Sequence, residues 1–431
     1  MKIINTQDSN FKKEFEAILQ RAKSDIKGVS KIVENIIDEI IQDGNEALKK
    51  HIEKFDKWSA KSDEDLLISK DLMEKAYLNL DEELKKSLHK AFDRIKAYHE
   101  KQLPKSWIDF EDSGTILGQK VTPVDRAGLY IPGGKAAYPS SLLMNAIPAL
   151  VAKVKEIVVC TPTPNNEVNE LLLAACYLCG VTNVYKVGGA SAIAAMAYGT
   201  KTIPKVDVIT GPGNIFVATA KKMVFGEVNI DMIAGPSEIG ILADESANKK
   251  YIAYDLLSQA EHDEMASSIL ITTCKDLAIE VCNEVKNILK TLSRKEIAQK
   301  SIDERGAIIV AKDMEEAISL MNEIAPEHLE VITKNPFELL PFIKHAGAIF
   351  LGENTPEPIG DYIAGPNHTL PTGSTAKFYS PLNVENFLKK SSIISFSKKA
   401  ISELGEECAL LADTEGLEAH AKSVRARLKD K

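Results

Sequence analysis

The stretch VDVITGPGNIFVATAKKMV (residues 206–224) contains, in order, the three parts from which the fold is built. A short apolar run at 206–209 is followed by the turn GPGN at 211–214 and by an apolar helical segment at 215–224. This pattern predicts a buried strand, a tight turn and a helix. Strand, turn and helix in repetition are typical of a parallel sheet with helices on its faces.

Three similar units come before this stretch. Their predicted strands lie at 127–131, 156–160 and 183–187, and turns follow at Pro132-Gly133-Gly134, 161–164 and Gly188-Gly189. Because crossovers between parallel strands are right-handed, the turns are expected along one edge of the sheet, where ligands bind. Helix N-termini there favour anionic ligands, although glycine equally serves a tight turn. The sequence has neither G-x-G-x-x-G nor G-x-x-x-x-G-K-[ST], so the turns alone do not identify NAD.

Changes in the pattern of apolar, charged and glycine residues divide the chain into four segments. Residues 1–105 carry apolar residues at helical spacing between charges, which predicts a helical arm. The glycine turns predict a first α/β unit at 106–236, and a second set of strands and helices predicts another at 237–383. The tail, 384–431, returns to helix and short strand. We therefore predict the α/β fold class, with two parallel-sheet units, an N-terminal helical arm and a C-terminal tail.

The composition excludes several classes of protein. The chain has 431 residues, of which 44% are hydrophobic and 27% charged, so it can bury two cores. Its net charge of −9 argues against nucleic acid as a partner, because phosphate contacts need clustered Lys and Arg. No stretch approaches the ~18 apolar residues of a membrane span, and residues 1–11 lack the apolar core of a secretory signal. We expect a cytoplasmic protein.

Cysteines and N-terminal histidines carry little chemistry in this interpretation. The six cysteines are expected to be reduced thiols. Cys176 and Cys179 form a C-x-x-C in an apolar helical run, where core packing is favoured over a redox dithiol or half a zinc site. His51, His89 and His99 lie among Lys and Glu and are predicted to be surface residues.

Two segments contain candidate metal ligands. Gln259 and His262 are three residues apart at the end of a predicted helix, so both can project from one face toward a metal. The alternative is that His262 only stabilises the helix C-terminus. Asp361 lies in the glycine-rich loop 360–368, where it is either a metal ligand or a carboxylate that binds local amides.

Two further segments contain candidate site residues. Pro326 ends a predicted helix and places Glu327 and His328 at a turn, where an adjacent carboxylate and imidazole can divide proton transfers. Such a dipeptide also occurs on surfaces by chance. Glu415 and His420 are five residues apart, so on one straight helix they do not share a face.

Seven motifs in this order resemble the histidinol dehydrogenase family over nearly the whole chain, from residue 121 to 420. They are GLYIPGG (128–134), GPGN (211–214), DMIAGPSE (231–238), LLSQAEH (256–262), APEHLE (325–330), GDYIAGPNHTLPT (360–372) and EGLEAHAKSV (415–424). Each motif is short, but the set at this spacing is specific. The family fold comprises two incomplete Rossmann-like units plus terminal segments, in agreement with the α/β pattern.

The resemblance implies a role for each matching residue. The zinc ligands are expected to be Gln259, His262, Asp361 and His420. The acid–base pair is expected to be Glu327 and His328. Ser237 and Glu415 match substrate contacts, and the four zinc ligands and His328 also face the substrate. NAD contacts are expected at Tyr130, Ser191 and Asn214. In the family, Glu415 and His420 come from the partner subunit, which implies a homodimer.

One position departs from the family pattern. Ser191 stands where the family usually has a glutamine that contacts NAD. Because the serine side chain is shorter, we expect a weaker or water-bridged contact at this position.

The resemblance implies the oxidation of L-histidinol to L-histidine by two successive NAD molecules. The zinc ion is expected to hold the substrate, since its imidazole and amino nitrogens are natural zinc ligands. One alternative is a relative on the same scaffold that oxidises another small alcohol. Another is a binding or scaffold protein that keeps zinc for structure, but it would not need Glu327 and His328.

Overall fold

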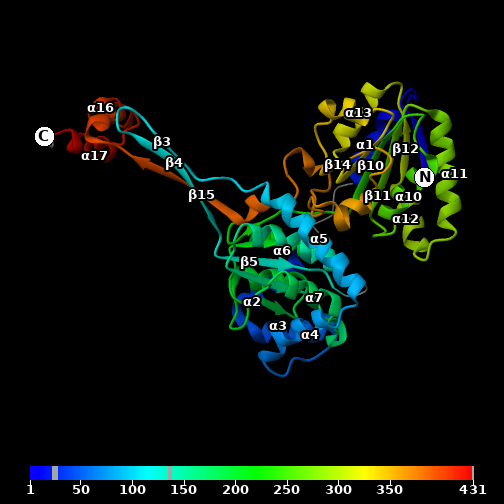
Figure 1. Cartoon of the computed structure of the whole chain (residues 1–431), viewed down its shortest axis with the longest axis horizontal. Coiled ribbons are helices and arrows are strands. Elements are labelled where there is room, and N and C mark those ends of the chain that lie inside the picture. The colour runs from blue at the N-terminus through cyan, green and yellow to red at the C-terminus, as the bar shows by residue number, and fades with distance from the viewer. Residues whose placement is uncertain (22–27, 134–137, 430–431) are drawn as a thin grey trace. The chain divides into compact units, whose positions relative to one another are not determined.

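Two parallel sheets and one antiparallel sheet form the framework of the computed structural model, which describes residues 1–21, 28–133 and 138–429 (Figure 1). The described chain divides into two compact units, Met1–Gln102 with Asp125–Phe387 and Leu103–Val124 with Leu388–Lys431. The first unit contains both parallel sheets. Of the predicted turn Pro132-Gly133-Gly134, Gly134 lies outside the described residues.

The first parallel sheet has the strand order β2-β7-β6-β5-β8-β9. These strands are β2 (Leu67–Ile68), β5 (Arg126–Tyr130), β6 (Glu156–Cys160), β7 (Asn183–Tyr185), β8 (Val208–Thr210) and β9 (Asn229–Ile230). Strand β5 pairs in parallel with both β6 and β8, and only β2 runs antiparallel to its neighbour. The strand order therefore reverses between β5 and β8, which is where open α/β sheets bind ligands.

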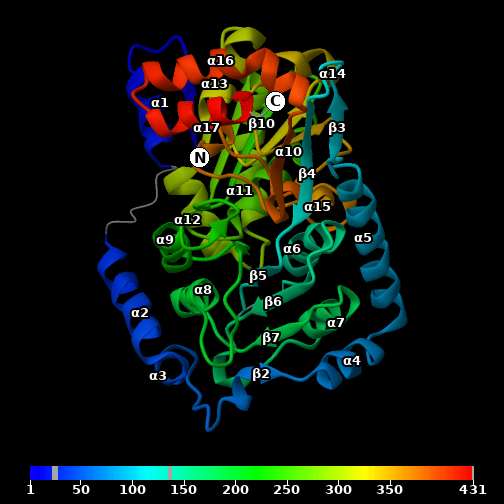
Figure 2. The same ribbon diagram turned by 90° about the vertical axis from the view of Figure 1, so that its left-hand side faces the viewer.

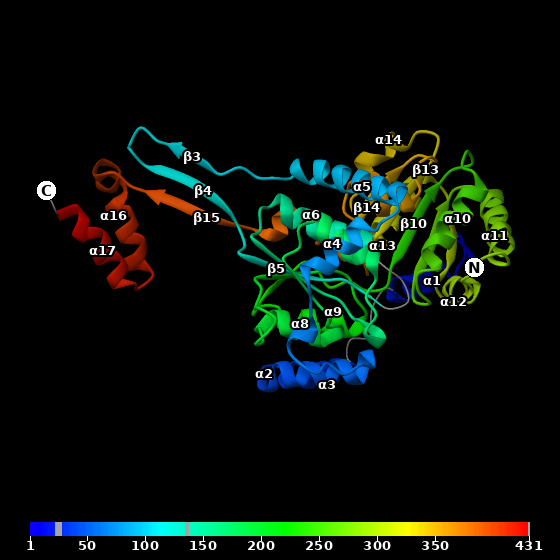
Figure 3. The same cartoon turned by 60° about the horizontal axis from the view of Figure 1, so that its bottom comes forward.

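Helices cover both faces of this sheet (Figure 2). On one face lie α6 (Pro139–Val151) and α7 (Glu170–Leu178), and on the other α8 (Gly189–Tyr198) and α9 (Ile215–Val224). Helices α2 (Ser30–Asp43) and α3 (Asn45–Asp56) lie beyond α8 and α9 (Figure 3). Since α8 lies between the sheet and α2, all its residues from Ala190 to Ala197 are buried, as expected for a helix that is apolar all round. Two further helices, α4 (Lys70–Leu78) and α5 (Glu82–Glu100), pack on α7 and α6.

The second parallel sheet has the order β1-β12-β11-β10-β13-β14, and all its pairs are parallel. The strands are β1 (Lys2–Asn5), β10 (Glu238–Ala243), β11 (Ser267–Thr272), β12 (Ala307–Val310), β13 (His328–Ile332) and β14 (Ala348–Leu351). One face packs on α10 (Lys249–Ala260), α11 (Lys275–Leu289) and α12 (Lys295–Arg305), and the other on α1 (Phe11–Arg21) and α13 (Met314–Ile324). The predicted α/β class with two parallel-sheet units is confirmed.

The prediction of a purely helical arm is wrong at its start. Residues Lys2–Asn5 form β1, the edge strand of the second sheet, with Ile4 opposite Ile309. Four residues are too few for a periodic pattern to stand out, and the pairing partner lies some 300 positions away in the sequence.

Two N-terminal histidines are buried, which corrects the prediction of surface residues. His51 is 6% and His99 0% exposed. Each lies on the inner face of an amphipathic helix, where the polar ring finds partners: His99 Nδ1 bonds to the Ile95 carbonyl at 2.8 Å. His89 is partly exposed and bonds to the Tyr77 hydroxyl.

The second compact unit is an antiparallel sheet with two helices. Its elements are β3 (Trp107–Phe110), β4 (Ile116–Pro123), β15 (Leu388–Ser395), α16 (Lys398–Thr414) and α17 (Glu418–Lys429). Strand β4 pairs with both β3 and β15. Residues 106–124, which the sequence prediction joined to the first α/β unit, therefore belong to one unit with the tail, and β4 pairs directly with β15. That pairing joins segments about 270 residues apart, so no local sequence pattern predicts it.

The remaining elements are short. They are α14 (Pro336–Leu339), α15 (Glu357–Ile359), the π-helical turn Gly360–Ala364 and the 3-10 turns Glu64–Leu66, Pro164–Asn166, Leu340–Phe342, Thr375–Lys377 and Val384–Phe387. Within the described ranges, no helix is both long and apolar enough to span a bilayer.

The C-x-x-C pair belongs to the core. Cys176 and Cys179 are 0% and 1% exposed, and Cys160 on β6 is also fully buried. Burial raises the pKa of all three thiols, because it disfavours the charged thiolate. This environment supports core packing, since a redox dithiol needs an accessible thiol of low pKa.

A buried ion pair holds the GPGN turn. Gly211 has φ 115°, and a Cβ there would lie 2.0 Å from the Tyr130 carbonyl oxygen, so only glycine fits. The Gly211 amide donates to Asp231 Oδ2 at 2.8 Å, and Lys221 Nζ donates to the Gly211 carbonyl at 2.9 Å. Lys221 and Asp231 also form an ion pair with side chains 3% and 0% exposed. The turn is thereby fixed between β8 and α9.

We expect Lys221→Met to destabilise the protein by about 3–5 kcal/mol, because it leaves Asp231 buried without its counter-charge. The neighbouring Lys222 is exposed, so Lys222→Met is a matched control with an expected effect within about 0.5 kcal/mol. Urea unfolding of both variants measures the difference. Equal midpoints for the two variants would contradict this role of the ion pair.

Candidate active site

The residues with predicted chemistry gather at the amino-terminal ends of strands in the second sheet. Glu238 and His328 are the first residues of β10 and β13, and the register places His328 opposite Ile239. Ser237 directly precedes β10. The expectation that ligands bind at the carboxyl edge therefore does not describe this sheet.

The entry of Glu327 and His328 into the sheet follows from local backbone chemistry. Helix α13 ends at Ile324, Ala325 adopts a left-handed conformation with φ 50°, and Pro326 prevents continuation of the helix. The chain then turns directly into β13. As a result Glu327 and His328 are 7% and 4% exposed, which rules out a chance surface dipeptide.

Two hydrogen bonds to Glu238 orient the pair. The Glu238 amide donates to Glu327 Oε2 at 2.9 Å, and His328 Nδ1 lies 3.1 Å from the Glu238 carbonyl oxygen. Because a carbonyl oxygen only accepts, Nδ1 must carry a hydrogen. Nε2 has no hydrogen-bond partner among the described residues and is the atom left for chemistry.

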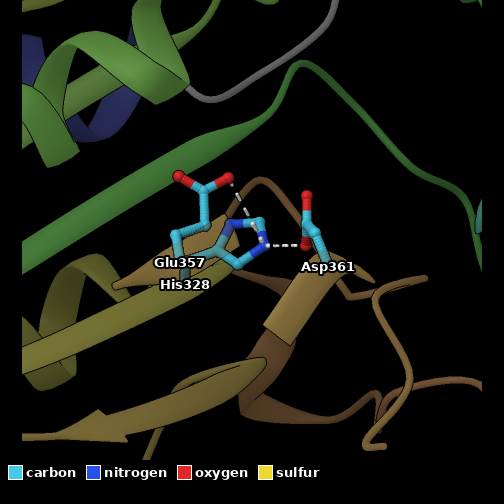
Figure 4. A group of neighbouring side chains, drawn as sticks. All are labelled: His328, Glu357 and Asp361. Atoms are coloured by element: carbon cyan, nitrogen blue, oxygen red, sulfur yellow. Dashed lines mark ion pairs between the residues drawn. The ribbon is translucent and has the colours of Figure 1, made fainter. Parts of the chain in front are cut away.

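Two carboxylates lie opposite this nitrogen (Figure 4). His328 Nε2 is 3.6 Å from Asp361 Oδ1 and 4.0 Å from Glu357 Oε1. Ligand atoms of these three residues lie within 4.8 Å of one another, which is a spacing that could hold a metal ion. Asp361 belongs to the π-helical turn Gly360–Ala364, and its carbonyl oxygen lies 3.1 Å from His368 Nδ1.

Burial and charge shift the proton affinities of these groups. Burial raises the pKa of Glu327 to about 8, so this carboxyl can exchange a proton near neutral pH. Burial acts to lower the pKa of His328, but Glu327, Glu357 and Asp361 outweigh it, and the pKa lies well above its ordinary value. Burial acts to raise the pKa of Asp361, but His328 and His368 lower it by a larger amount, so the pKa lies below its ordinary value. Negative charge concentrated around one imidazole favours a bound cation.

Gln259 and His262 lie beside this group at the end of α10. Gln259 is 0% exposed, and its Oε1 has no hydrogen-bond partner among the residues that the structure describes. Its Nε2 lies 3.4 Å from His262 Nδ1, and the charge of His262 contributes to the lowered pKa of Asp361. A buried amide oxygen without a hydrogen-bond partner is rare, and coordination of a metal ion would satisfy it.

Glu357 is a site residue that the sequence analysis passed over as part of a loop. It is 1% exposed at the start of α15, where its amide donates to Glu330 Oε1 at 2.8 Å and its Oε2 accepts from Ser258 Oγ at 3.2 Å. The signal in the sequence was a carboxylate between Pro356 and Pro358, a rigid context that fixes its backbone. Burial raises the pKa of this carboxyl group.

A cavity of about 630 Å³ opens at this group and has the size of a small-molecule site. Its wall includes His328, Asp361 and His368 together with apolar side chains such as Phe350 and Leu382. The structure therefore brings His328 and Asp361 together at a cavity. Glu327 and Gln259 are buried, whereas His262 is exposed and contacts Gln259.

Glu415 and His420 are not part of this group. They lie in the second compact unit, Glu415 at the end of α16 and His420 on α17, and both are exposed. The site described from one chain comprises residues of the first unit.

The predicted NAD contacts lie at the carboxyl edge of the first sheet. Tyr130 ends β5 and its hydroxyl accepts a hydrogen bond from the Gly189 amide at 3.2 Å. Asn214 follows β8 and caps α9 by accepting from the amides of Phe216 and Val217. Tyr130 and Asn214 thus flank the point where the strand order reverses. Ser191 lies in the first turn of α8, after β7.

The chain is similar in sequence and structure to known histidinol dehydrogenases. The family model for histidinol dehydrogenase matches residues 19–428. The chain is 73% identical to the histidinol dehydrogenase of Sulfurimonas denitrificans over 98% of both chains, and 67% identical to that of Wolinella succinogenes over 99% of both.

A solved structure agrees with the sequence relatives. The crystal structure of histidinol dehydrogenase from Elizabethkingia anophelis superposes with a TM-score of 0.93 at 35% identity, covering 100% of this chain and 98% of that one. Both the fold and the sequence over nearly its full length therefore assign this chain to the histidinol dehydrogenase family.

Proposed function

We propose that the chain oxidises L-histidinol to L-histidine by way of the aldehyde, using zinc and NAD. The observation that carries the proposal is the buried Glu327–His328 pair, whose free Nε2 lies 3.6 Å from Asp361 at the wall of a cavity. Membership of the histidinol dehydrogenase family supports the choice of substrate.

Zinc is proposed to bind Gln259, His262 and Asp361, with His420 of the partner subunit as the fourth ligand. A mixed set of imidazole, amide and carboxylate donors suits zinc, and the partnerless Oε1 of Gln259 fits a ligand atom. When bound, zinc would anchor the imidazole and amino nitrogens of the substrate. His328, Glu357 and Asp361 form an alternative metal site that shares Asp361 with the proposed one. A metal bound there would be coordinated by His328 Nε2, which then could not accept a proton.

His328 is proposed as the base for the alcohol proton. Its Nδ1–H is held by the Glu238 carbonyl, so the ring, when it is neutral, presents the lone pair of Nε2 to the cavity. The surrounding carboxylates raise the pKa of this ring, and a zinc ion bound at Asp361 would offset their charge and favour the neutral form. When bound, NAD would accept the hydride of the alcohol carbon with its electron pair, while Nε2 takes up the hydroxyl proton. Fixed orientation of the ring supports both oxidations, because the same base can act again on the hydrated aldehyde.

Glu327 is proposed to act between the two oxidations. The aldehyde must add water before a second hydride can leave, and a carboxylate can take the proton of that water. The Glu238 amide keeps Glu327 Oε2 in place through this exchange. Glu357 is proposed to add negative charge beside His328 rather than to exchange protons, because its Oε2 already accepts a hydrogen bond from Ser258. Its backbone amide is held by Glu330.

NAD is proposed to bind at the carboxyl edge of the first sheet, in contact with Tyr130, Ser191 and Asn214. The reversal of strand order between β5 and β8 supports this position. The rigid turn at Gly211 and the glycines at 188 and 189 let backbone amides approach the dinucleotide closely.

The working unit is proposed to be a homodimer. Glu415 and His420 are exposed in the second compact unit, so they are accessible to another chain. In this arrangement, the partner subunit's Glu415 and the partner subunit's His420 complete each site.

The proposed function is tested by turnover with L-histidinol. Purified protein with zinc and NAD is expected to form two NADH for each histidine, because alcohol and aldehyde are oxidised in turn. NADH and histidine are counted by absorbance and chromatography. Zinc-loaded protein that turns over another small alcohol but not L-histidinol would replace the proposal by a different dehydrogenase on this scaffold.

Replacing Glu327 by Gln should slow the second oxidation more than the first. Loss of one general base costs about 10²–10⁴-fold in rate, and only hydration of the aldehyde requires this one. Rates of NADH formation from histidinol and from histidinaldehyde measure the two steps separately. The exposed Glu323 on α13 provides the control variant Glu323→Gln. Equal loss in both steps would contradict the division of labour between Glu327 and His328.

If each active site contains residues of both subunits, two inactive variants should regain activity when they form a mixed dimer. In a mixed dimer of Asp361→Ala and His420→Ala chains, one of the two sites receives only intact residues, so the purified mixed dimer should have about half of the wild-type activity. Co-expression with different tags and purification of the mixed dimer measures it. Asp361→Ala with Gln259→Ala is the control, since both changes lie in the same unit and no intact site forms. An inactive mixed dimer in the first pair would contradict the sharing of sites.

A further inference from the structure

Three side chains from three helices form a hydrogen-bonded relay that ends at Ser191. His51 Nδ1 on α3 lies 2.9 Å from Ser191 Oγ on α8, and His51 Nε2 lies 2.6 Å from Glu39 Oε2 on α2. Ser191 is 3% and His51 6% exposed, whereas the Glu39 side chain is 58% exposed. The relay therefore runs from solvent into the interior of the first parallel sheet's helical layer.

The inner end of the relay lies where this sheet should bind a ligand. Ser191 is in the first turn of α8, directly after Gly188 and Gly189 at the carboxyl end of β7. Gly188 provides no side chain to cap the helix, and the Gly189 amide donates to the Tyr130 hydroxyl. An uncapped helix start at the carboxyl edge of a parallel sheet is a ready site for a dinucleotide.

The relay determines which way the Ser191 hydroxyl donates. A carboxylate only accepts hydrogen bonds, so Glu39 holds a hydrogen on His51 Nε2. In the neutral ring Nδ1 is then an acceptor, and Ser191 must donate its hydroxyl hydrogen to it. The lone pairs of Ser191 Oγ remain for a ligand, so a ligand group in contact with this oxygen has to be a donor.

The same residue types occur in serine hydrolases, but this relay does not fit that chemistry. The serine is 3% exposed within a helix, and the carboxylate that would support the base is open to solvent. A nucleophile also needs an accessible oxygen, whereas a contact to an enclosed cofactor needs only one held in place.

We infer that His51 and Glu39 are positioning residues for NAD, which hold the Ser191 hydroxyl as an acceptor for a ribose hydroxyl or an amide N–H of the dinucleotide. A phosphate oxygen is excluded at this position, because it offers no hydrogen to donate. The inference rests on the proposed function, since it specifies how the NAD site of that dehydrogenase is built.

Titration of NAD into the zinc-loaded enzyme by calorimetry tests the relay. Ser191→Ala removes the acceptor and should weaken NAD binding about three- to tenfold, the effect of one hydrogen bond. Glu39→Gln keeps the size of the exposed side chain but releases the ring from one tautomer, so a smaller loss is expected. Glu34→Gln is the matched control on the same helix, because Glu34 is exposed and pairs only with Lys31 in the described contacts.

The double variant Ser191→Ala/Glu39→Gln separates positioning from a structural role. Because Glu39 acts through Ser191, the double variant should bind NAD as Ser191→Ala alone does, with KM for NAD raised and KM for L-histidinol unchanged. Additive losses, or losses that follow the unfolding temperature of the free protein, would make the relay a structural link between helices. NAD binding unchanged in Glu39→Gln would overturn the inference and leave the dehydrogenase intact. A wild-type protein that neither binds NAD nor oxidises histidinol would contradict both this inference and the proposed function.

Discussion

The parallel pairing of β10 with β13 is the interaction on which the site depends. It places Ile239 opposite His328, so that the main chain of Glu238 reaches both Glu327 and His328. Both strands are fully buried, because helices pack on each face of the sheet. A register slip of one residue would turn His328 to the opposite face, so the hydrophobic core itself sets the orientation of this side chain.

Burying this much negative charge costs stability unless something compensates for it. Glu327, Glu357 and Asp361 surround one imidazole, and the buried Glu330 touches Glu357. Elsewhere in the first unit, the buried Asp231 has a lysine of its own at the glycine turn. The group around His328 has no lysine or arginine among its described partners, and a cation bound at Asp361 would compensate for part of this charge. Burial raises the pKa of Glu327 to about 8, so this carboxyl group exchanges a proton near neutral pH.

The two parallel sheets have the same strand order, and their candidate site residues lie at opposite edges. In the first, glycine turns follow β5, β7 and β8 at the carboxyl edge. In the second, Glu238 and His328 stand at the amino-terminal ends of β10 and β13, where strands rather than loops carry them. Residues on strands are held more rigidly than residues on loops, so the His328 ring keeps one orientation.

The sequence by itself determined the α/β class, both parallel-sheet units and the family, because strand, turn and helix are local patterns and the seven motifs are contiguous. It also indicated Glu327 and His328 through the proline before them. Only the tertiary structure decided that Lys2–Asn5 is a strand, that Glu357 faces His328 and that His51 holds Ser191. Each of these depends on partners that lie 29 to about 300 positions away in the sequence, and a local pattern contains no record of such contacts.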